Sequence, residues 1–172
     1  MRRLILLLIA AFGLALPAGA LALRSSPGDG TLVVDNALGS VTVRARGGII
    51  GHFDQGQLIV EDPNEADGKS PVVYGAEQVR DVGPKTTVYS GDDVRFRMTG
   101  GAYRVQVQAL GIDISAVGRG SAVLDGSGFR DRQTGRYSVN GSPFQKMPAT
   151  PTKVNIGQPQ AAQQHESKDS TK

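Results

Sequence analysis

Residues 102–109 read Ala-Tyr-Arg-Val-Gln-Val-Gln-Ala, and this stretch decides the fold. Apolar side chains alternate with polar ones at every second position, which is the pattern of a β-strand with one buried and one solvated face. Residues 40–46 (Ser-Val-Thr-Val-Arg-Ala-Arg) and 93–98 (Asp-Val-Arg-Phe-Arg-Met) repeat this pattern. The middle of the chain therefore predicts half-buried strands that cover a single core.

Shorter apolar segments extend the pattern on both sides. They lie at 31–34, 58–60, 72–74, 87–89, 112–114 and 122–124, which makes about ten expected strands. After residue 23 no stretch keeps a helical period for three turns. We therefore expect an all-β fold, and specifically an antiparallel β-sandwich or a flattened barrel.

Glycine-containing dipeptides separate several of these segments. Gly47-Gly48, Gly100-Gly101 and Asn140-Gly141 can adopt the positive φ angles that two-residue hairpin turns require. We interpret them as hairpin turns, which predicts antiparallel pairing. Pro143 lacks an amide donor, so the strand after Asn140-Gly141 is expected at a sheet edge.

The spacing of apolar residues suggests an internal duplication. A shift of 62 positions overlays repeats at 30–62 and 92–126 and brings Leu32 onto Val94, Val34 onto Phe96 and Val43 onto Val105. A one-residue gap then brings Ile49 onto Ile112. Two such repeats would form two facing layers, although any alternating chain aligns with itself to some degree. Strand centres every eight or nine residues also suit the alternative fold, a short β-solenoid with two strands per coil.

The chain divides into four segments. Arg2 and Arg3 precede an uncharged run at 4–23 that ends in small residues, so residues 1–23 are expected to be a signal peptide or, if uncleaved, an N-terminal membrane anchor. Residues 24–29 form a linker and 30–147 the β domain, in which 63–91 connect the repeats. Residues 148–172 are polar and predict a disordered tail. Both readings of the first segment predict an exported, extracytoplasmic protein.

Composition limits the partners and the chemistry. The net charge is +3, but without Arg2 and Arg3 it falls to +1, so no general attraction to nucleic acid is expected. Aromatic residues make up 5% of the chain and Trp is absent, which argues against a base-stacking or sugar-stacking groove. There is no Cys, so disulfides and thiol catalysis are excluded.

No catalytic or metal-binding motif stands out. The only histidines are His52 and His165, and no Gly-x-Ser-x-Gly elbow accompanies either. The segment that begins at Asp62 resembles an EF-hand loop, but Ala66 and Val73 occupy ligand positions. We therefore expect a protein without enzymatic activity, cofactor or metal. The alternative is an envelope glycan hydrolase whose two carboxylates the sequence does not identify.

Arginines on the polar faces of the strands are the best candidate site. Guanidinium groups set close together bind carboxylate or phosphate bidentately. This pattern predicts an anion-binding surface for an anionic envelope polymer or another envelope protein, and it comprises Arg44, Arg46, Arg95, Arg97 and Arg104. The alternative is a solvated sheet face whose charge is balanced by Asp35, Asp93 and Asp113.

The segments Gly39-Ser40-Val41-Thr42-Val43 and Gly111-Ile112-Asp113-Ile114-Ser115 resemble exported bacterial β-repeat proteins of the adhesin and auto-transporter adhesin head type. The resemblance covers roughly residues 30–126 and consists of the regular spacing of strands and glycines. It implies a surface interaction module of the cell envelope without assigned catalysis, and it transfers no functional residue. A self-associating structural subunit that pairs through exposed strand edges is a further alternative.

Overall fold

The computed structural model describes residues 26–64, 69–127 and 135–157 of the chain. The predicted signal at 1–23 and residues 158–172 lie outside this part. The strands are β1 (Gly30–Glu61), β2 (Val72–Tyr74), β3 (Gln78–Gly83), β4 (Thr86–Asp125), β5 (Arg136–Val139), β6 (Gln145–Lys146) and β7 (Thr152–Ile156). The described residues contain no helix long and apolar enough to cross a membrane. The expected all-β fold with antiparallel pairing is confirmed.

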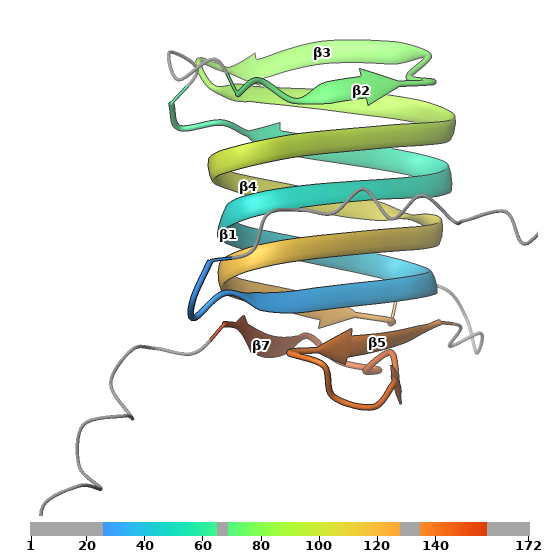
Figure 1. The fold of residues 1–172 in the computed structure, drawn as a ribbon. Coiled ribbons are helices and arrows are strands. Elements are labelled where there is room, and N and C mark those ends of the chain that lie inside the picture. The colour runs from blue at the N-terminus through green and yellow to red at the C-terminus, as the bar shows by residue number, and fades with distance from the viewer. Residues whose placement is uncertain (1–25, 65–68, 128–134, 158–172) are drawn as a thin grey trace, which may run out of the picture.

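Two long strands, β1 and β4, wind around each other as interleaved, antiparallel coils (Figure 1). Each residue in the middle of β1 has two partners in β4, one on either side. Val41 lies opposite both Val107 and Leu124, which are 17 residues apart, and Ile49 lies opposite Met98 and Ala116, which are 18 apart. One coil therefore takes 17 or 18 residues, and the strand spacing of eight or nine residues in the sequence corresponds to half a coil.

Each coil crosses two layers. Layer A contains residues 40–46 and 57–61 of β1 together with 86–90, 102–109 and 119–125 of β4, and it is extended by β3 and β7. Layer B contains residues 31–38 and 48–55 of β1 together with 92–99 and 110–117 of β4, and it is extended by β2 and β5. The sheet is not closed into a barrel. Its two layers are those of the expected flattened sandwich, while its continuous winding resembles the solenoid alternative.

The core lies between the layers, because the inward residues of both layers are apolar. Val41, Val43, Val105 and Val107 of layer A and Ile49 of layer B are fully buried. They belong to one cluster with the other inward side chains: Leu32, Val34, Phe53, Leu58, Val60, Val94, Phe96, Met98, Tyr103, Ile112, Ile114, Ala122 and Leu124. Burial of one such aliphatic side chain contributes about 1.5–3 kcal/mol to folding.

Glycines form the corners where a strand passes from one layer to the other. Gly47 lies opposite Gly118, with φ angles of +149° and +149°. A Cβ on Gly47 would lie 2.1 Å from the Val117 carbonyl oxygen. Only glycine allows the two chains to bend at this point and stay hydrogen-bonded.

The hairpin interpretation is wrong for two of the three dipeptides. Gly47-Gly48 lies inside β1 and Gly100-Gly101 inside β4, so both strands continue through these corners. Asn140-Gly141 does form the expected two-residue turn, in which the Ser142 amide donates to the Val139 carbonyl oxygen at 3.0 Å. Among the described strands, the following one, β6, pairs only with β5 at a sheet edge, as Pro143 predicted.

The C-terminal side of the domain closes one end of the coil. β7 pairs with residues 120–124 of β4, and Ile156 is only 2% exposed. The predicted tail therefore starts too early at residue 148, because Thr152–Ile156 is a core strand. Met147, also 2% exposed, completes this closed end, and the Asn140 side chain accepts from the Gly157 amide at 3.0 Å and donates to the Asn155 carbonyl oxygen at 3.0 Å.

β2 and β3 form the opposite, open end of the coil (Figure 1). Both pair with the first coil of β4 along one edge, and neither has a strand partner on its other edge within the described residues. All six residues of β3 are exposed. The two ends of the molecule therefore differ in how completely they cover the core.

Candidate functional site

The structure divides the five predicted anion-binding arginines between the two layers. Arg44 lies directly opposite Arg104 in layer A, and Arg46 lies in the same layer. Arg95 and Arg97 lie in layer B, opposite His52 and Ile50. The expectation of one patch of five arginines is therefore wrong, because β4 turns the corner at Gly100-Gly101 between Arg97 and Arg104.

The coil brings an additional arginine to the three that remain together. Arg119 lies opposite Arg46 on the next passage of β4. The order across layer A is thus Arg104, Arg44, Arg46 and Arg119, and we call these four residues the arginine strip. Arg119 follows Gly118 at a corner, outside any long alternating run, so the sequence offered no signal that would place it beside Arg46.

Two members of the arginine strip have carboxylate partners and two do not. Arg104 pairs with Glu61 at 3.4 Å, while Arg119 pairs with Asp29 at 3.2 Å and also donates to the Pro27 carbonyl oxygen. Arg44 and Arg46 are exposed and make no ion pair within the part of the chain that the structure describes. Like charges directly opposite each other on a sheet repel, so this arrangement favours binding of an anion.

The strands that carry the arginine strip pack closely against the core on their inner side. Val43 and Val105 lie fully buried between its members on the inner side of layer A, and Tyr103 is 4% exposed. The Tyr103 hydroxyl donates to the Gly48 carbonyl oxygen at 3.3 Å, across the corner of the coil. Burial raises the pKa of this phenol above its usual value, so it stays neutral at physiological pH.

Layer B carries a different charged group around His52, on the outer side of the sheet. The His52 Nε2 lies 2.8 Å from Asp93 Oδ1 and 3.9 Å from Asp54 Oδ1, and its Nδ1 lies 3.7 Å from Asp113 Oδ2. Arg95 also contacts Asp93, at 3.3 Å. The coil gathers these residues because 95, 52 and 113 are direct neighbours across three adjacent strands.

The chemistry of this His52 group is that of a surface ion-pair network. The pKa of Asp93 is lowered below its usual value, first by the hydrogen bond from His52 and then by the charge of Arg95. Both ring nitrogens of His52 face carboxylates, which leaves neither in position to accept a proton from a serine hydroxyl. Among the described residues, no three His, Asp or Glu side chains are placed to hold a metal ion.

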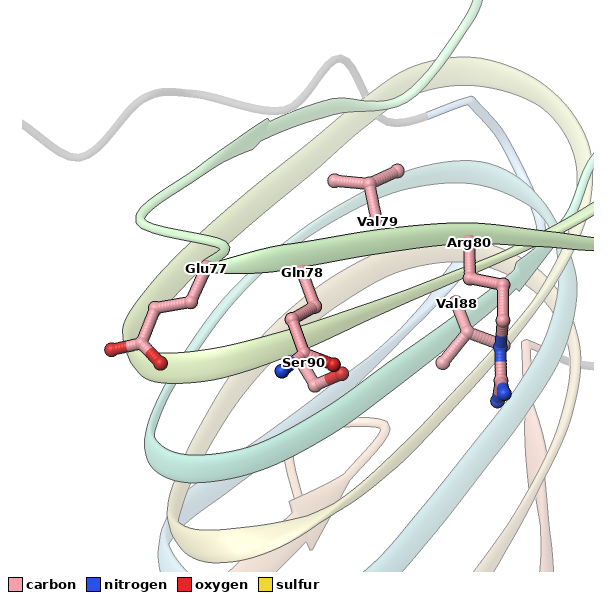
Figure 2. A pocket seen from close by; sticks show the side chains of 6 residues that line it. All are labelled: Glu77, Gln78, Val79, Arg80, Val88 and Ser90. Carbon is pink, nitrogen blue, oxygen red and sulfur yellow. The ribbon is translucent and has the colours of Figure 1, made fainter.

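A hollow of about 540 Å³ lies between β3 and β4 near the open end. Figure 2 shows Gln78, Arg80 and Val88 on one side of the strands and Val79 projecting from the other. Glu77 is the one carboxylate among its lining residues. The hollow therefore does not provide the pair of carboxylates that glycoside hydrolysis generally uses.

The arginine strip is thus the described surface with the most cationic groups in register, and the His52 group is balanced by its own acids. Comparison with models of protein families, with curated proteins and with solved structures finds no match to this chain.

Proposed function

We propose that this chain is an exported, non-enzymatic interaction module of the cell envelope that binds an anionic polymer through the arginine strip. The observation that supports this most is the placement of Arg44 and Arg46, which are exposed, lie beside two other arginines and have no carboxylate partner among the described residues. Arginine binds phosphate and carboxylate with two parallel hydrogen bonds.

The shape of the arginine strip favours a polymer over a small anion. Neighbouring strands lie about 4.8 Å apart, and residues i and i+2 on one strand about 6.7 Å apart. The four guanidinium groups thus follow a zigzag line over three adjacent strand passages. A chain with one negative charge every ~5–7 Å, such as a polyol phosphate or a polyuronate, can contact several of them at once.

Export rests on the N-terminal segment. Arg2 and Arg3 followed by the uncharged run at 4–23 support secretion across a membrane. Fractionation of cells that express the full chain tests this: we expect the protein outside the cytoplasm. A product that stays soluble in the cytosol and accumulates at full length would contradict it.

Binding is tested with purified protein and three immobilised polymers: a polyol phosphate, a polyuronate and a neutral dextran. We expect retention on at least one anionic polymer and none on dextran. The double variant Arg44→Gln/Arg46→Gln should lose at least tenfold in affinity. Its matched control is Arg95→Gln/Arg97→Gln, which removes the same charge from layer B.

Salt dependence provides a second readout. Binding to the arginine strip should weaken as the salt concentration rises from 0.05 to 0.5 M, because exposed charges are screened. Equal losses in the two double variants would show a nonspecific charge effect. Such a result, or retention on neither anionic polymer, would overturn the proposal.

A further inference from the structure

The open end of the coil exposes side chains that continue the core. Cross-strand neighbours on the same face follow one another from Val107 to Leu58, Tyr89 and Val79. Val107 and Leu58 are fully buried, and Tyr89 packs against the core while partly exposed. Val79, the last of the row, is 61% exposed. The inner face of the sheet thus reaches solvent at β3.

Two other large apolar side chains are exposed on the same two end strands. Tyr74 of β2 is 63% exposed and Val82 of β3 is 52% exposed. At the closed end, by contrast, Ile156 and Met147 are each 2% exposed. Large apolar side chains are therefore buried at the closed end and exposed at the open end. Exposed apolar side chains that lie close together are typical of an interaction surface.

Each strand at the open end also has an unpaired edge. β2 and β3 form hydrogen bonds only toward β4 in the described residues, so the backbone groups on their outer edges are available for another strand. β2 belongs to layer B and β3 to layer A. A partner that fits this end must present a strand to each layer at once, which a single extended peptide cannot do.

We infer that the open end joins two copies of this chain end to end, with β3 antiparallel to β3 and β2 antiparallel to β2 of the second copy. A two-fold axis normal to both layers reverses the strand direction and leaves each strand in its own layer. β1 and β4 already pair antiparallel in both layers of the coil. The second copy thus continues the existing pattern of hydrogen bonds and covers the end of the core.

The exposed apolar side chain of β3 selects where the axis crosses the strand. An axis through Val79 places the two Val79 side chains together over the end of the core and sets Gln78 opposite Arg80 of the second copy. It also sets Asp81 opposite Glu77, which precedes β3 and lies at the margin of the contact. An axis through Arg80 or Gln78 would instead place Val79 opposite the Asp81 or the Glu77 carboxylate. The register centred on Val79 is therefore the one we assign.

Light scattering coupled to size exclusion tests the assembly. We expect the purified protein to elute with twice the mass of one chain at micromolar concentration. Val79→Lys should reduce the mass to that of one chain, because an inward-facing charge on an edge strand opposes pairing. The matched control is Val123→Lys, at a residue 37% exposed on a strand that is paired on both edges.

Cross-linking tests the register independently. The chain has no cysteine of its own, so an introduced cysteine is the only thiol that can form a disulfide. Val79→Cys should form a covalent dimer under mild oxidation, whereas Val123→Cys should not. Circular dichroism of each variant verifies that the β fold is kept. A single-chain mass at every concentration up to 1 mM, or a dimer that Val79→Lys leaves intact, would overturn the inference. Open-ended oligomers would overturn it as well, because a two-fold contact closes at two copies.

Discussion

Val43 lies directly opposite Val105, and the two residues are 62 positions apart, the same shift that overlays the two predicted repeats. A two-fold axis between antiparallel strands must pass between a residue and its own equivalent, and this pair meets that condition in layer A. In layer B, Gly51 lies opposite Ile114, at the shift of 63 that follows the one-residue gap. The register is compatible with the internal duplication that the spacing of apolar residues suggests.

This relationship predicts equal energetic roles for Val43 and Val105. Both are fully buried, so each truncation to Ala should lower the free energy of unfolding by about 2 kcal/mol through lost burial and the remaining cavity. Urea unfolding of the two single variants measures this. We expect the losses to agree within about 0.5 kcal/mol. A difference of more than twofold would argue against equivalent positions.

Gly47→Ala should destabilise the coil strongly. The φ angle of +149° disfavours any side chain, and the new Cβ would lie 2.1 Å from the Val117 carbonyl oxygen. We expect a loss on the order of 3 kcal/mol in thermal or urea unfolding. Gly83→Ala is the control, because its new Cβ would meet nothing closer than 3.8 Å. If both variants unfold alike, the close approach at the corner is not as described.

Asp93 links stability to pH. His52 and then Arg95 lower its pKa in the folded protein, so the ionised carboxylate stabilises the fold above the unfolded-state value of about 3.9. That contribution is lost as the pH falls through the lowered folded-state pKa. Asp93→Asn suits the test because Asn tolerates the φ angle of +52°.

The stability difference between the native chain and Asp93→Asn should therefore be present at pH 7 and vanish in acid. NMR titration of the Asp93 carboxyl measures the shift directly, and His52→Ala should return the pKa toward its usual value. A titration midpoint at or above that of an ordinary aspartate would contradict the contact with His52.

Arg44 should destabilise the fold, because it lies directly opposite Arg104 and the two like charges repel each other. Arg44→Thr should raise the free energy of unfolding by about 0.5 kcal/mol at low salt, with a smaller gain at 0.5 M NaCl. Arg97→Thr is the control, since Arg97 lies opposite Ile50 and Val72 and has no charged residue directly across. A loss of stability in Arg44→Thr that exceeds the loss in the control would show that Arg44 is not repelled.

Period-two alternation was sufficient to predict the fold class, and it also identified most of the core. The inward positions at 41, 43, 94, 96, 105 and 107 are buried as expected, since local alternation alone sets which side chains share a face. The eight- or nine-residue spacing was visible too. It could not be assigned to half a coil, because a glycine pair that turns a hairpin and one that bends a continuing strand look the same in sequence.

Neighbours across the coil could not be predicted, because they depend on which passage of β4 lies beside which passage of β1. Arg119 meets Arg46, and Asp113 meets His52, only through the 17- or 18-residue period. β7 was also missed, since polar segments surround it. Its sequence, Thr-Lys-Val-Asn-Ile, does carry a brief alternation with Val154 and Ile156 on the inner face, which was the one available signal.

The winding of β1 and β4 brings the four residues of the arginine strip together. One NMR experiment tests this winding most directly. In the wound structure Val41 is next to both Val107 and Leu124, on opposite sides in the same layer. Methyl NOE spectra should therefore show cross-peaks from Val41 to both residues. Cross-peaks to only one of them would mean that β1 and β4 pair along a single edge, and the account of the coil and of the arginine strip would be wrong.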